Sequence, residues 1–305
     1  MSKSSASLET EIPADPTSLE VLAELPWLRR FPQRSPTLPP ATHTNAYILG
    51  EHELVIVDPG TPSVDENNRL LAYLRTLSQD AERAGKQLRV IGIFLTHHHR
   101  DHVSGAAYLQ RALQVPVWAH HQTAVRVEVL HREEDLRVHR IIEDGEVLEL
   151  GGARFEALHT PGHAPGHLCL FDAQTRDLIA GDMAASVGTI LIHPDDDGDM
   201  GQYVRELQRL LDLRPQRLWP AHGAVVKDAP SLLQRYLDHR HLREQKVLAA
   251  LDPQPRSLME LLLQAYNDTP AALHGLASGS LRAHLYKLKD EGRAIETATN
   301  LWHLS

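Results

Sequence analysis

Short apolar runs alternate with amphipathic stretches along the first third of the chain. Apolar runs at 46–50 and 54–57 are separated by charged residues, and they predict a β-hairpin closed by the turn signal Asp58-Pro59-Gly60. Leucines at helical spacing within 64–84 predict a helix. The continuous apolar run at 90–95 has the length of a strand and is typical of a strand covered on both faces.

The same alternation continues to about residue 251, with more strands in the middle of the chain. Strands and helices in this order predict two packed sheets with helices on the outside, an α/β (α+β) fold. The expected helices are 102–113, 199–212 and 229–251, and the expected strands are 115–119, 153–159, 167–172, 177–180 and 217–220.

Prolines mark a boundary near residue 252. Pro253 and Pro255 end the preceding helix because proline lacks a backbone N–H and restricts the residue before it. Two helical stretches and two short strands follow, and the order helix, helix, hairpin indicates a winged-helix-like arrangement. We therefore expect a flexible acidic N-terminal arm (1–26), a large domain (27–251) and a small C-terminal winged-helix-like domain (252–305).

Composition narrows the class of protein. Cys169 is the one cysteine of the chain, so no internal disulfide forms, which fits a reducing compartment. The formal net charge of -9 disfavours a dedicated nucleic-acid binder, because phosphate contacts need clustered Lys and Arg. No apolar run approaches the ~20 residues that span a bilayer, and the N-terminus has no signal-peptide core. We expect a soluble, cytoplasmic protein that makes no membrane contact.

The chain holds 20 histidines, and their positions are more informative than their number. The run Thr96-His97-His98-His99-Arg100-Asp101-His102 directly follows the apolar strand at 90–95 and precedes a helix. His97 and His99 would face the same side of extended backbone, and Asp101 and His102 follow as the chain turns. Imidazoles and a carboxylate suit zinc, but these donors are too many for one ion that keeps an open position. The run therefore predicts a metal site.

Three further donors directly follow predicted strands. They are His163 in Thr160-Pro161-Gly162-His163, Asp182 in Gly181-Asp182, and His222 in Pro220-Ala221-His222. Side chains at strand ends are held by a rigid element and point into a crevice. Each signal alone is more often structural, but four such signals in one chain favour a single shared site.

These motifs resemble those of the metallo-β-lactamase-fold hydrolase superfamily. Its signature His-x-His-x-Asp-His matches the histidine run, and its later motifs match the three further donors in the same order. The resemblance covers about residues 40–250 and implies an αββα catalytic domain with the site at one edge of the paired sheets. It also implies a ligand partition: His97, His99 and His163 for one metal, Asp101, His102 and His222 for the other, and Asp182 bridging both.

Two metals arranged in this way can share a hydroxide, because metal binding lowers the pKa of water from about 15.7 toward 7. One of them can also polarise the substrate carbonyl or phosphoryl oxygen. We expect Asp101 to act first as a ligand and second as a base that orients the hydroxide. Two Zn²⁺ ions are the expected cofactors, although the same donor set also accepts iron or manganese.

Other histidines are expected to support the site or to lie outside it. His167 follows His163 by four residues, as in the family's Pro-Gly-His-x-x-Gly-His run, where the later histidine supports the ligands. His159 is a weaker candidate for the same supporting role. We expect His98 to face away from the metals and Cys169 to be a buried strand residue.

Asp182 stands where the best-known zinc β-lactamases carry a cysteine, which disfavours a dedicated β-lactamase and favours the glyoxalase II-like and nuclease-like branches. The acidic run at 193–200, the segment 239–245 and the tail are similar to a subgroup that includes the lactamase-β-like 2 endoribonuclease. That subgroup is related to thioester hydrolases of polyketide pathways. Residues 183–201 contain no Lys or Arg, which disfavours a dedicated glutathione thioesterase.

Two main functions stay open at this point. The first is hydrolysis of a small-molecule thioester, ester, lactone or related carbonyl bond by the metal-bridging hydroxide. The alternative is an endoribonuclease acting on single-stranded RNA, which would need a basic groove. Residues 254–305 hold five basic and five acidic side chains, so we expect this tail to be a packing or substrate-capping module rather than a nucleic-acid-binding one. The complete ligand set disfavours a non-catalytic metal-binding protein, and a homodimer stays open.

Overall fold

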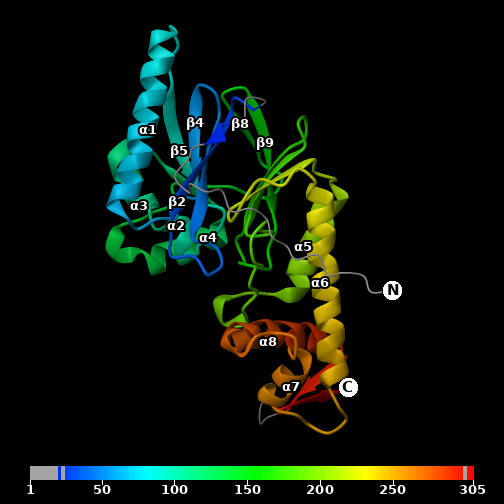
Figure 1. Ribbon diagram of the computed structural model, residues 1–305. Coiled ribbons are helices and arrows are strands. Elements are labelled where there is room, and N and C mark those ends of the chain that lie inside the picture. Colours follow the sequence, from blue (N-terminus) through cyan, green and yellow to red (C-terminus); the bar gives the residue numbers. More distant parts are fainter. Residues whose placement is uncertain (1–19, 22–24, 298–300) are drawn as a thin grey trace.

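Two β-sheets pack face to face in the computed structural model, which describes residues 20–21, 25–297 and 301–305 (Figure 1). The first sheet has its strands in chain order: β1 (Glu20–Val21), β2 (Leu28–Arg34), β3 (His43–Leu49), β4 (Glu53–Val57), β5 (Arg89–Phe94), β6 (Val117–Ala119) and β7 (Arg140–Ile141). The second has the order β12 (Arg217–Pro220), β11 (Asp177–Gly181), β10 (Leu168–Asp172), β9 (Ala153–His159), β8 (Val147–Leu150).

Helices cover the outer faces of both sheets (Figure 1). The first sheet carries α1 (Val64–Arg83), α2 (Arg100–Val103), α3 (Ala106–Leu113) and α4 (His121–Leu130), and the second carries α5 (Met200–Asp212) and α6 (Ala229–Ala250). Short 3-10 helices are Arg132–Glu134, Pro194–Asp196 and Ala271–Leu273. Among the described residues, none of the helices is both long and apolar enough to cross a membrane.

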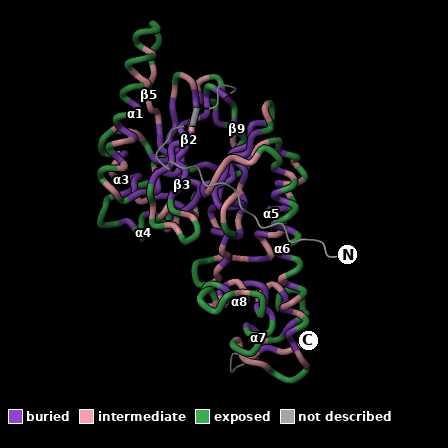
Figure 2. Tube along the Cα trace, viewed as in Figure 1, coloured by how far each residue is buried: buried purple, intermediate pink, exposed green. Residues whose placement is uncertain are grey.

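Apolar side chains from both sheets form one buried cluster at the interface between them. Most residues of the central strands are accordingly buried (Figure 2). Trp27 meets Phe155 edge-on across this interface, and Tyr47 meets Trp219 in the same way. Two further apolar layers join each sheet to its own helices. The arrangement is an αββα sandwich, so the prediction of two packed sheets with outer helices is confirmed.

The predicted hairpin is present, but its turn lies elsewhere. Strands β3 and β4 are antiparallel, and residues 50–52 form the turn between them. Asp58-Pro59-Gly60 instead follows β4 and leads toward α1. A Cβ on Gly60 would lie 1.6 Å from the backbone oxygen of Asp101. Glycine at this position therefore lets the end of β4 approach the start of α2, which places Asp58 beside His102.

The helix predicted at 102–113 is in fact two helices, α2 and α3. The break falls at Gly105, whose backbone N–H donates to the backbone oxygen of Pro59 at 2.7 Å. A Cβ on Gly105 would lie 2.6 Å from that oxygen and from Oδ1 of Asn67. Close packing against the segment before α1 therefore interrupts a stretch that the sequence pattern predicted to be continuous.

Helix α6 runs from the second sheet into a C-terminal module (Figure 1). The module consists of α7 (Leu258–Ala265), α8 (His274–Asp290), β13 (Ala294–Glu296) and β14 (Trp302–Leu304). Ser257 and Glu260 form a capping box that begins α7. Trp302, Leu261 and Leu281 are buried in the core of the module. The predicted order of helix, helix and hairpin is confirmed.

Of the predicted N-terminal arm, the structure describes residues 20–21 and 25–26. Strand β1 pairs with β2, and Leu25 is buried among the side chains between the two sheets. Within the predicted arm, Glu20–Val21 thus pair with the first sheet and Leu25 packs in the core between the sheets. The rest of the predicted arm lies outside the described residues.

Candidate metal centre

The donors identified in the sequence lie together at one edge of the two sheets. Strands β11 and β12 are parallel neighbours, so Asp182 and His222 leave the second sheet side by side. The backbone N–H of Leu168 donates to the backbone oxygen of Thr96 at 2.9 Å, which joins this edge to the end of β5. The structure brings together all seven predicted ligands: His97, His99, Asp101, His102, His163, Asp182 and His222.

Two groups of three donors that share no residue form within this cluster, and a third group, His97 with His102 and Asp182, overlaps both. In the first group, Nδ1 of His99 lies 3.0 Å from Nε2 of His97 and 2.9 Å from Nε2 of His163. The ligating atoms of the second group lie within 4.8 Å of one another, and they belong to Asp101, His102 and His222. These groups coincide with the two ligand sets that the family resemblance implies.

Asp182 lies between the two groups. Its Oδ2 is 3.4 Å from Nε2 of His163, which belongs to the first group. Its Oδ1 is 3.6 Å from Nε2 of His102 and 3.4 Å from Nε2 of His222, which belong to the second. One carboxylate thus reaches both groups, as a bridging ligand must.

Each histidine of the first group has an oxygen atom close to its outer ring nitrogen. Nδ1 of His97 is hydrogen-bonded to Oγ1 of Thr96 at 2.9 Å, and Nδ1 of His163 to the backbone oxygen of Leu191 at 2.9 Å. Nε2 of His99 lies 3.0 Å from Oδ2 of Asp196, a charge contact without the angles of a hydrogen bond. An acceptor on the outer nitrogen fixes the tautomer and leaves the inner nitrogen free to bind a metal.

The second group is held in the same way. Nδ1 of His102 lies 2.8 Å from Oδ2 of Asp58, and Nδ1 of His222 lies 3.1 Å from the backbone oxygen of His43. Asp58 also accepts hydrogen bonds from the backbone N–H of Thr96 at 2.8 Å and from its hydroxyl at 2.6 Å. One buried carboxylate therefore orients His102 directly and His97 through Thr96.

Sequence reasoning missed Asp58 and Thr96. Asp58 was assigned to a turn because Pro59 and Gly60 follow it. The rule that identified the other donors would have found it, since Asp58 directly follows β4, a parallel neighbour of β5. Thr96 opened the histidine run but had no role assigned to it.

Burial keeps part of the cluster neutral. It lowers the pKa of His97 well below its ordinary value, and the neighbouring rings of His102 and His99 lower it further. Burial and the ring of His99 lower the pKa of His163 to about 4. Both imidazoles are therefore uncharged near pH 7, so a lone pair remains on each inner nitrogen.

The carboxylates have the opposite effect on the second group. Burial alone would lower the pKa of His102, but Asp182, Asp101 and Asp58 outweigh burial and raise it well above its ordinary value. Asp182 likewise outweighs burial at His222 and raises its pKa. The carboxylates thus favour a positive charge at the second group of donors, and a bound divalent cation would supply that charge.

The residues present fit a divalent transition metal. Within the described part of the chain, Nε2 of His102 and Oδ1 of Asp182 are buried and have no hydrogen-bond partner. A buried polar atom left in this state costs about 1–3 kcal/mol, and a metal bound between the two would satisfy both. Imidazole nitrogens and carboxylate oxygens together suit zinc, iron or manganese.

His167 and His159 lie outside the two groups and contact the segments that carry Asp182 and His163. Nε2 of His167 accepts a hydrogen bond from the backbone N–H of Asp182 at 3.0 Å. Burial lowers the pKa of His167 well below its ordinary value, so this nitrogen stays an acceptor. His159 contacts the backbone oxygen of Pro165 at 2.7 Å and so holds the turn that carries His163.

Two other residues of the sequence analysis have no place among the donors of either group. His98 is buried and belongs to neither group, although it lies between His97 and His99 in sequence. Cys169 is fully buried in β10, and burial raises the pKa of its thiol to about 12. The thiol is therefore neutral and screened from solvent.

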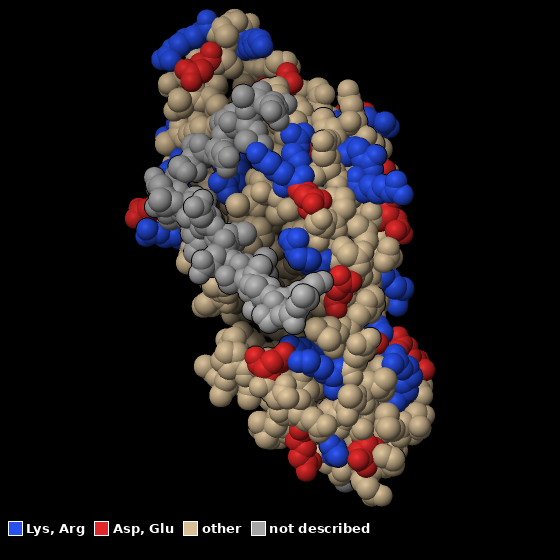
Figure 3. Space-filling model, turned by 45° about the vertical axis from the view of Figure 1, so that its right-hand side comes forward, with Lys and Arg blue, Asp and Glu red and all other residues tan. Residues whose placement is uncertain are grey.

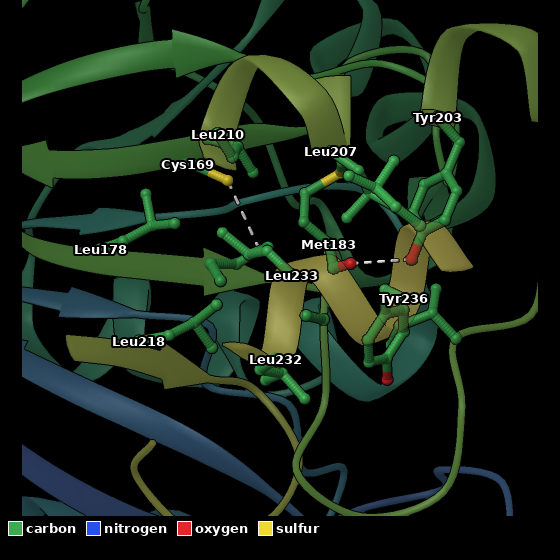
Figure 4. Packing of buried hydrophobic residues seen from close by; sticks show 14 of the residues in the cluster. Cys169, Leu178, Met183, Tyr203, Leu207, Leu210, Leu218, Leu232, Leu233 and Tyr236 are labelled. Carbon is green, nitrogen blue, oxygen red and sulfur yellow. Dashed lines mark hydrogen bonds between the residues drawn. The ribbon is translucent and has the colours of Figure 1, made fainter. Parts of the chain in front are cut away.

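The backbone after Asp182 is anchored in the core of the second sheet (Figure 4). The hydroxyl of Tyr203 donates to the backbone oxygen of Met183 at 2.7 Å. The hydroxyl of Tyr236 accepts from the backbone N–H of Ala185 at 3.0 Å. Both rings are buried, so the bridging carboxylate follows a strand and precedes a fixed turn.

A cavity of about 940 Å³ lies between the donors and the C-terminal module. Its lining includes Asp101, Asp182 and His222, together with the apolar side chains of Leu38, Val187, Ile190, Leu273 and Leu276. Arg240 and Arg243 also line it, but Arg240 donates to the backbone oxygen of Ile190 and Arg243 pairs with Asp268. The module therefore forms one wall of a largely apolar cavity.

A His/Asp cluster at the edge of an αββα sandwich defines a class of metal-dependent hydrolases. The profile of the Metallo-beta-lactamase superfamily matches residues 39–222, and that of the Beta-lactamase associated winged helix domain matches residues 257–302. This chain belongs to the metallo-beta-lactamase superfamily, and it is a hydrolase whose fold implies divalent metal binding.

Similar proteins support the lactamase-like branch. The chain is 28% identical over 258 residues to the Beta-lactamase-like protein 2 homolog of Drosophila melanogaster, covering 82% of this chain and 83% of that protein. It is 30% identical over 209 residues to an Atrochrysone carboxyl ACP thioesterase of Aspergillus chevalieri, covering 68% of this chain and 60% of that protein.

Solved structures share the whole architecture. A metallo-beta-lactamase family protein from Thermus thermophilus superposes with a TM-score of 0.71 at 25% identity, covering 93% of this chain and 100% of that one. A Beta-lactamase domain protein from Burkholderia ambifaria gives 0.77 at 19% identity, covering 96% and 97%. These matches extend through the C-terminal module, so sandwich and winged helix recur together.

Proposed function

We propose that the cluster holds two divalent metal ions, both zinc. His97, His99 and His163 bind the first ion, Asp101, His102 and His222 bind the second, and Asp182 bridges them. The observation that carries the proposal is the orientation of the five imidazoles. Each has an oxygen atom within 3.1 Å of its outer nitrogen, while the inner nitrogens and two carboxylates converge on one volume.

When bound, the metals would supply a water nucleophile at neutral pH and a Lewis acid for the substrate oxygen. The remaining work falls to the chain itself. Asp101 borders the cavity with a side chain that is 17% exposed, so it can accept a hydrogen bond from attacking water and orient it. The apolar walls exclude bulk water and hold the acyl part of the substrate.

We propose that the substrate is a small molecule with a thioester, ester or lactone bond. A cavity of about 940 Å³ with apolar walls matches the size and character of pockets that bury small ligands. A similar protein is named as an ACP thioesterase, which supports a thioester in particular. The proposed catalytic unit spans residues 27–251, and the winged-helix unit, 252–305, closes the cavity.

Single-stranded RNA is the second candidate, and the charges of the C-terminal module disfavour it. Every Lys and Arg in residues 254–305 is paired with a carboxylate: Arg256 with Asp252, Arg282 with Asp195, Lys287 and Arg293 with Glu244, and Lys289 with Glu296. The face in Figure 3 shows acidic and basic side chains interleaved over this module. A phosphate-binding surface would instead present unpaired basic groups.

The test is turnover of four substrates side by side by the zinc-loaded protein: an acyl thioester, a lactone, a β-lactam and single-stranded RNA. We expect the thioester or the lactone to be hydrolysed fastest, with no hydrolysis by the Asp182→Ala variant. Faster cleavage of RNA would replace the proposed substrate class with the second candidate. Metal analysis of protein purified without added metal tests zinc against iron and manganese.

A further inference from the structure

Residues 191–199 follow the anchored turn and contact two donors of the first group. The backbone oxygen of Leu191 accepts a hydrogen bond from Nδ1 of His163 at 2.9 Å. Oδ2 of Asp196 lies 3.0 Å from Nε2 of His99. This segment therefore supplies the outer partner for two of the three imidazoles in the group.

The same segment is fixed to α8 of the C-terminal module. Arg282 pairs with Asp195 through two contacts of 2.6 and 2.7 Å. The ring of His193 packs directly on the backbone of Gly279, where a Cβ would lie 2.1 Å from Cδ2 of the ring. Consecutive carboxylates thus have different partners, since Asp195 binds the module and Asp196 binds a metal donor.

The second group of donors is supported from another part of the chain. Asp58 orients His102, and the backbone oxygen of His43 orients His222. Among the described residues, no hydrogen bond or ion pair joins segment 191–199 to either imidazole. A change in this segment should therefore affect one metal position and leave the other unchanged.

From these contacts we infer that the C-terminal module controls metal affinity at one of the two positions, that of His97, His99 and His163. It acts through segment 191–199, with Asp196 as the positioning residue. The inference rests on the proposed two-metal site. A carboxylate beside the outer nitrogen of a metal-binding imidazole, as Asp196 is at 3.0 Å from Nε2 of His99, orients the ring and raises its basicity. Losing such a partner costs about 10- to 100-fold in metal affinity.

The first test removes the negative charge of Asp196 in the full chain. Zinc affinity is measured at each position by competition with a chelator, and His163→Ala and His222→Ala identify the first and second positions. Asp196→Asn should weaken the first position by about 10- to 100-fold and leave the second unchanged, and Asp196→Glu should restore most of the loss. An unchanged first position in Asp196→Asn would overturn the inference.

The second test acts from the module, with a matched pair of glycines on α8. Gly279→Ala displaces the ring of His193 and with it the segment, so zinc at the first position should weaken toward the lower end of that range, about 10-fold. Gly275→Ala is the control, because its Cβ would meet no atom within 4 Å. The same affinities in both variants would show that the module does not act through this contact.

A third test breaks an ion pair between the module and the segment. Arg282→Gln removes the partner of Asp195 and should weaken zinc at the first position only. Asp268→Asn is the control, since Asp268 joins the module to Arg243 and Lys246 of α6 away from the segment. Equal weakening in both variants would mean that general loosening of the module, rather than segment 191–199, is responsible.

The two proposals fail in different ways. If the wild-type protein binds fewer than two zinc ions, the proposed function fails, and the inference fails with it. If the wild type binds two zinc ions and either Asp196→Asn or both module variants leave the first position unchanged, only the inference fails. Circular dichroism verifies that each variant is folded. If Gly279→Ala does not fold, Arg282→Gln is the deciding variant, because it changes only a partly exposed ion pair.

Discussion

Oδ2 of Asp58 lies 2.8 Å from Nδ1 of His102, and the carboxylate is 2% exposed. The same oxygen accepts the hydroxyl of Thr96, whose oxygen lies 2.9 Å from Nδ1 of His97. Asp58 therefore contacts donors of both proposed metal positions, directly at one and through Thr96 at the other. No other carboxylate of the described chain holds the outer nitrogens of both groups in this way.

We expect Asp58→Ala to weaken zinc binding at both positions, by about 10- to 100-fold at that of His102 and less at that of His97. The reason is that both imidazoles lose the acceptor network that orients them. Chelator competition measures the two affinities. Asp177→Asn is the control, because this buried carboxylate of the second sheet pairs with Arg217 and Trp219 away from the metal donors. It should lower the melting temperature but keep two zinc ions.

Replacing Asp182 by Ala should remove one or both metals and abolish hydrolysis. The carboxylate lies within 3.6 Å of donors in both groups, so its loss leaves each position one ligand short. Elemental analysis of the purified variant should give clearly fewer than two metals per chain. Two retained metals with wild-type turnover would contradict the bridging assignment.

Leu276 on α8 tests whether the cavity binds the acyl part of the substrate. Leu276→Asp puts a charge in an apolar wall, so kcat/KM for a long-chain acyl thioester should fall roughly 10-fold or more, with a smaller effect on an acetyl thioester. Leu263→Asp on α7 is the matched control, because Leu263 is exposed and outside the cavity lining. Equal losses for both chain lengths would place the acyl group elsewhere.

Glu244 makes stability depend on pH in the acid range. Burial would raise its pKa, but contacts with His284 and Lys287 outweigh burial and lower the pKa from 4.5 to about 2. Because the pKa is lower in the folded state, the ionised Glu244 stabilises the fold at pH values above its pKa in the unfolded chain. This stabilisation is lost as pH falls from about 4.5 to 2. Glu244→Gln should therefore lower the free energy of unfolding at pH 7 by about 3 kcal/mol and flatten its decline in that window.

Denaturant unfolding at a series of pH values measures this effect. The control is Glu149→Gln, since the pair of Glu149 with Arg154 is largely exposed and exposed pairs contribute about 0–1 kcal/mol. If the free energy of unfolding fell equally steeply with decreasing pH in wild type and Glu244→Gln, Glu244 would not be the cause of the pH dependence.

Much of the fold and the donor set was predictable because both depend on local patterns. The apolar run at 90–95 has the length and composition of a strand, and donors that directly follow such strands are brought to one sheet edge by parallel pairing. His97, Asp182 and His222 were identified on this basis alone, and they lie together. The family resemblance then supplied which donors group with which.

The missed elements lack these patterns. Strand β2 carries Arg29, Arg30 and Pro32, which are typical of loops, yet Arg30 is buried and Pro32 lies opposite Asn45 in the sheet. Helix α4 leaves Val125, Val129 and Leu130 exposed, so its apolar positions follow no single face. The link between Asp196 and His99 joins residues far apart in sequence, and only the folded chain shows it.

Helix α6 is one continuous helix that contributes residues to the cores of both parts of the molecule. Leu233 and Leu237 pack in the core of the second sheet, while Val247 and Ala250 pack in the core of the C-terminal module. Because one helix belongs to both cores, unfolding of either part would expose its apolar residues, and we expect the two parts to melt in a single transition. A protein truncated after Ala250 would expose apolar surface and aggregate, which means that the cavity wall cannot be removed without loss of the enzyme's solubility.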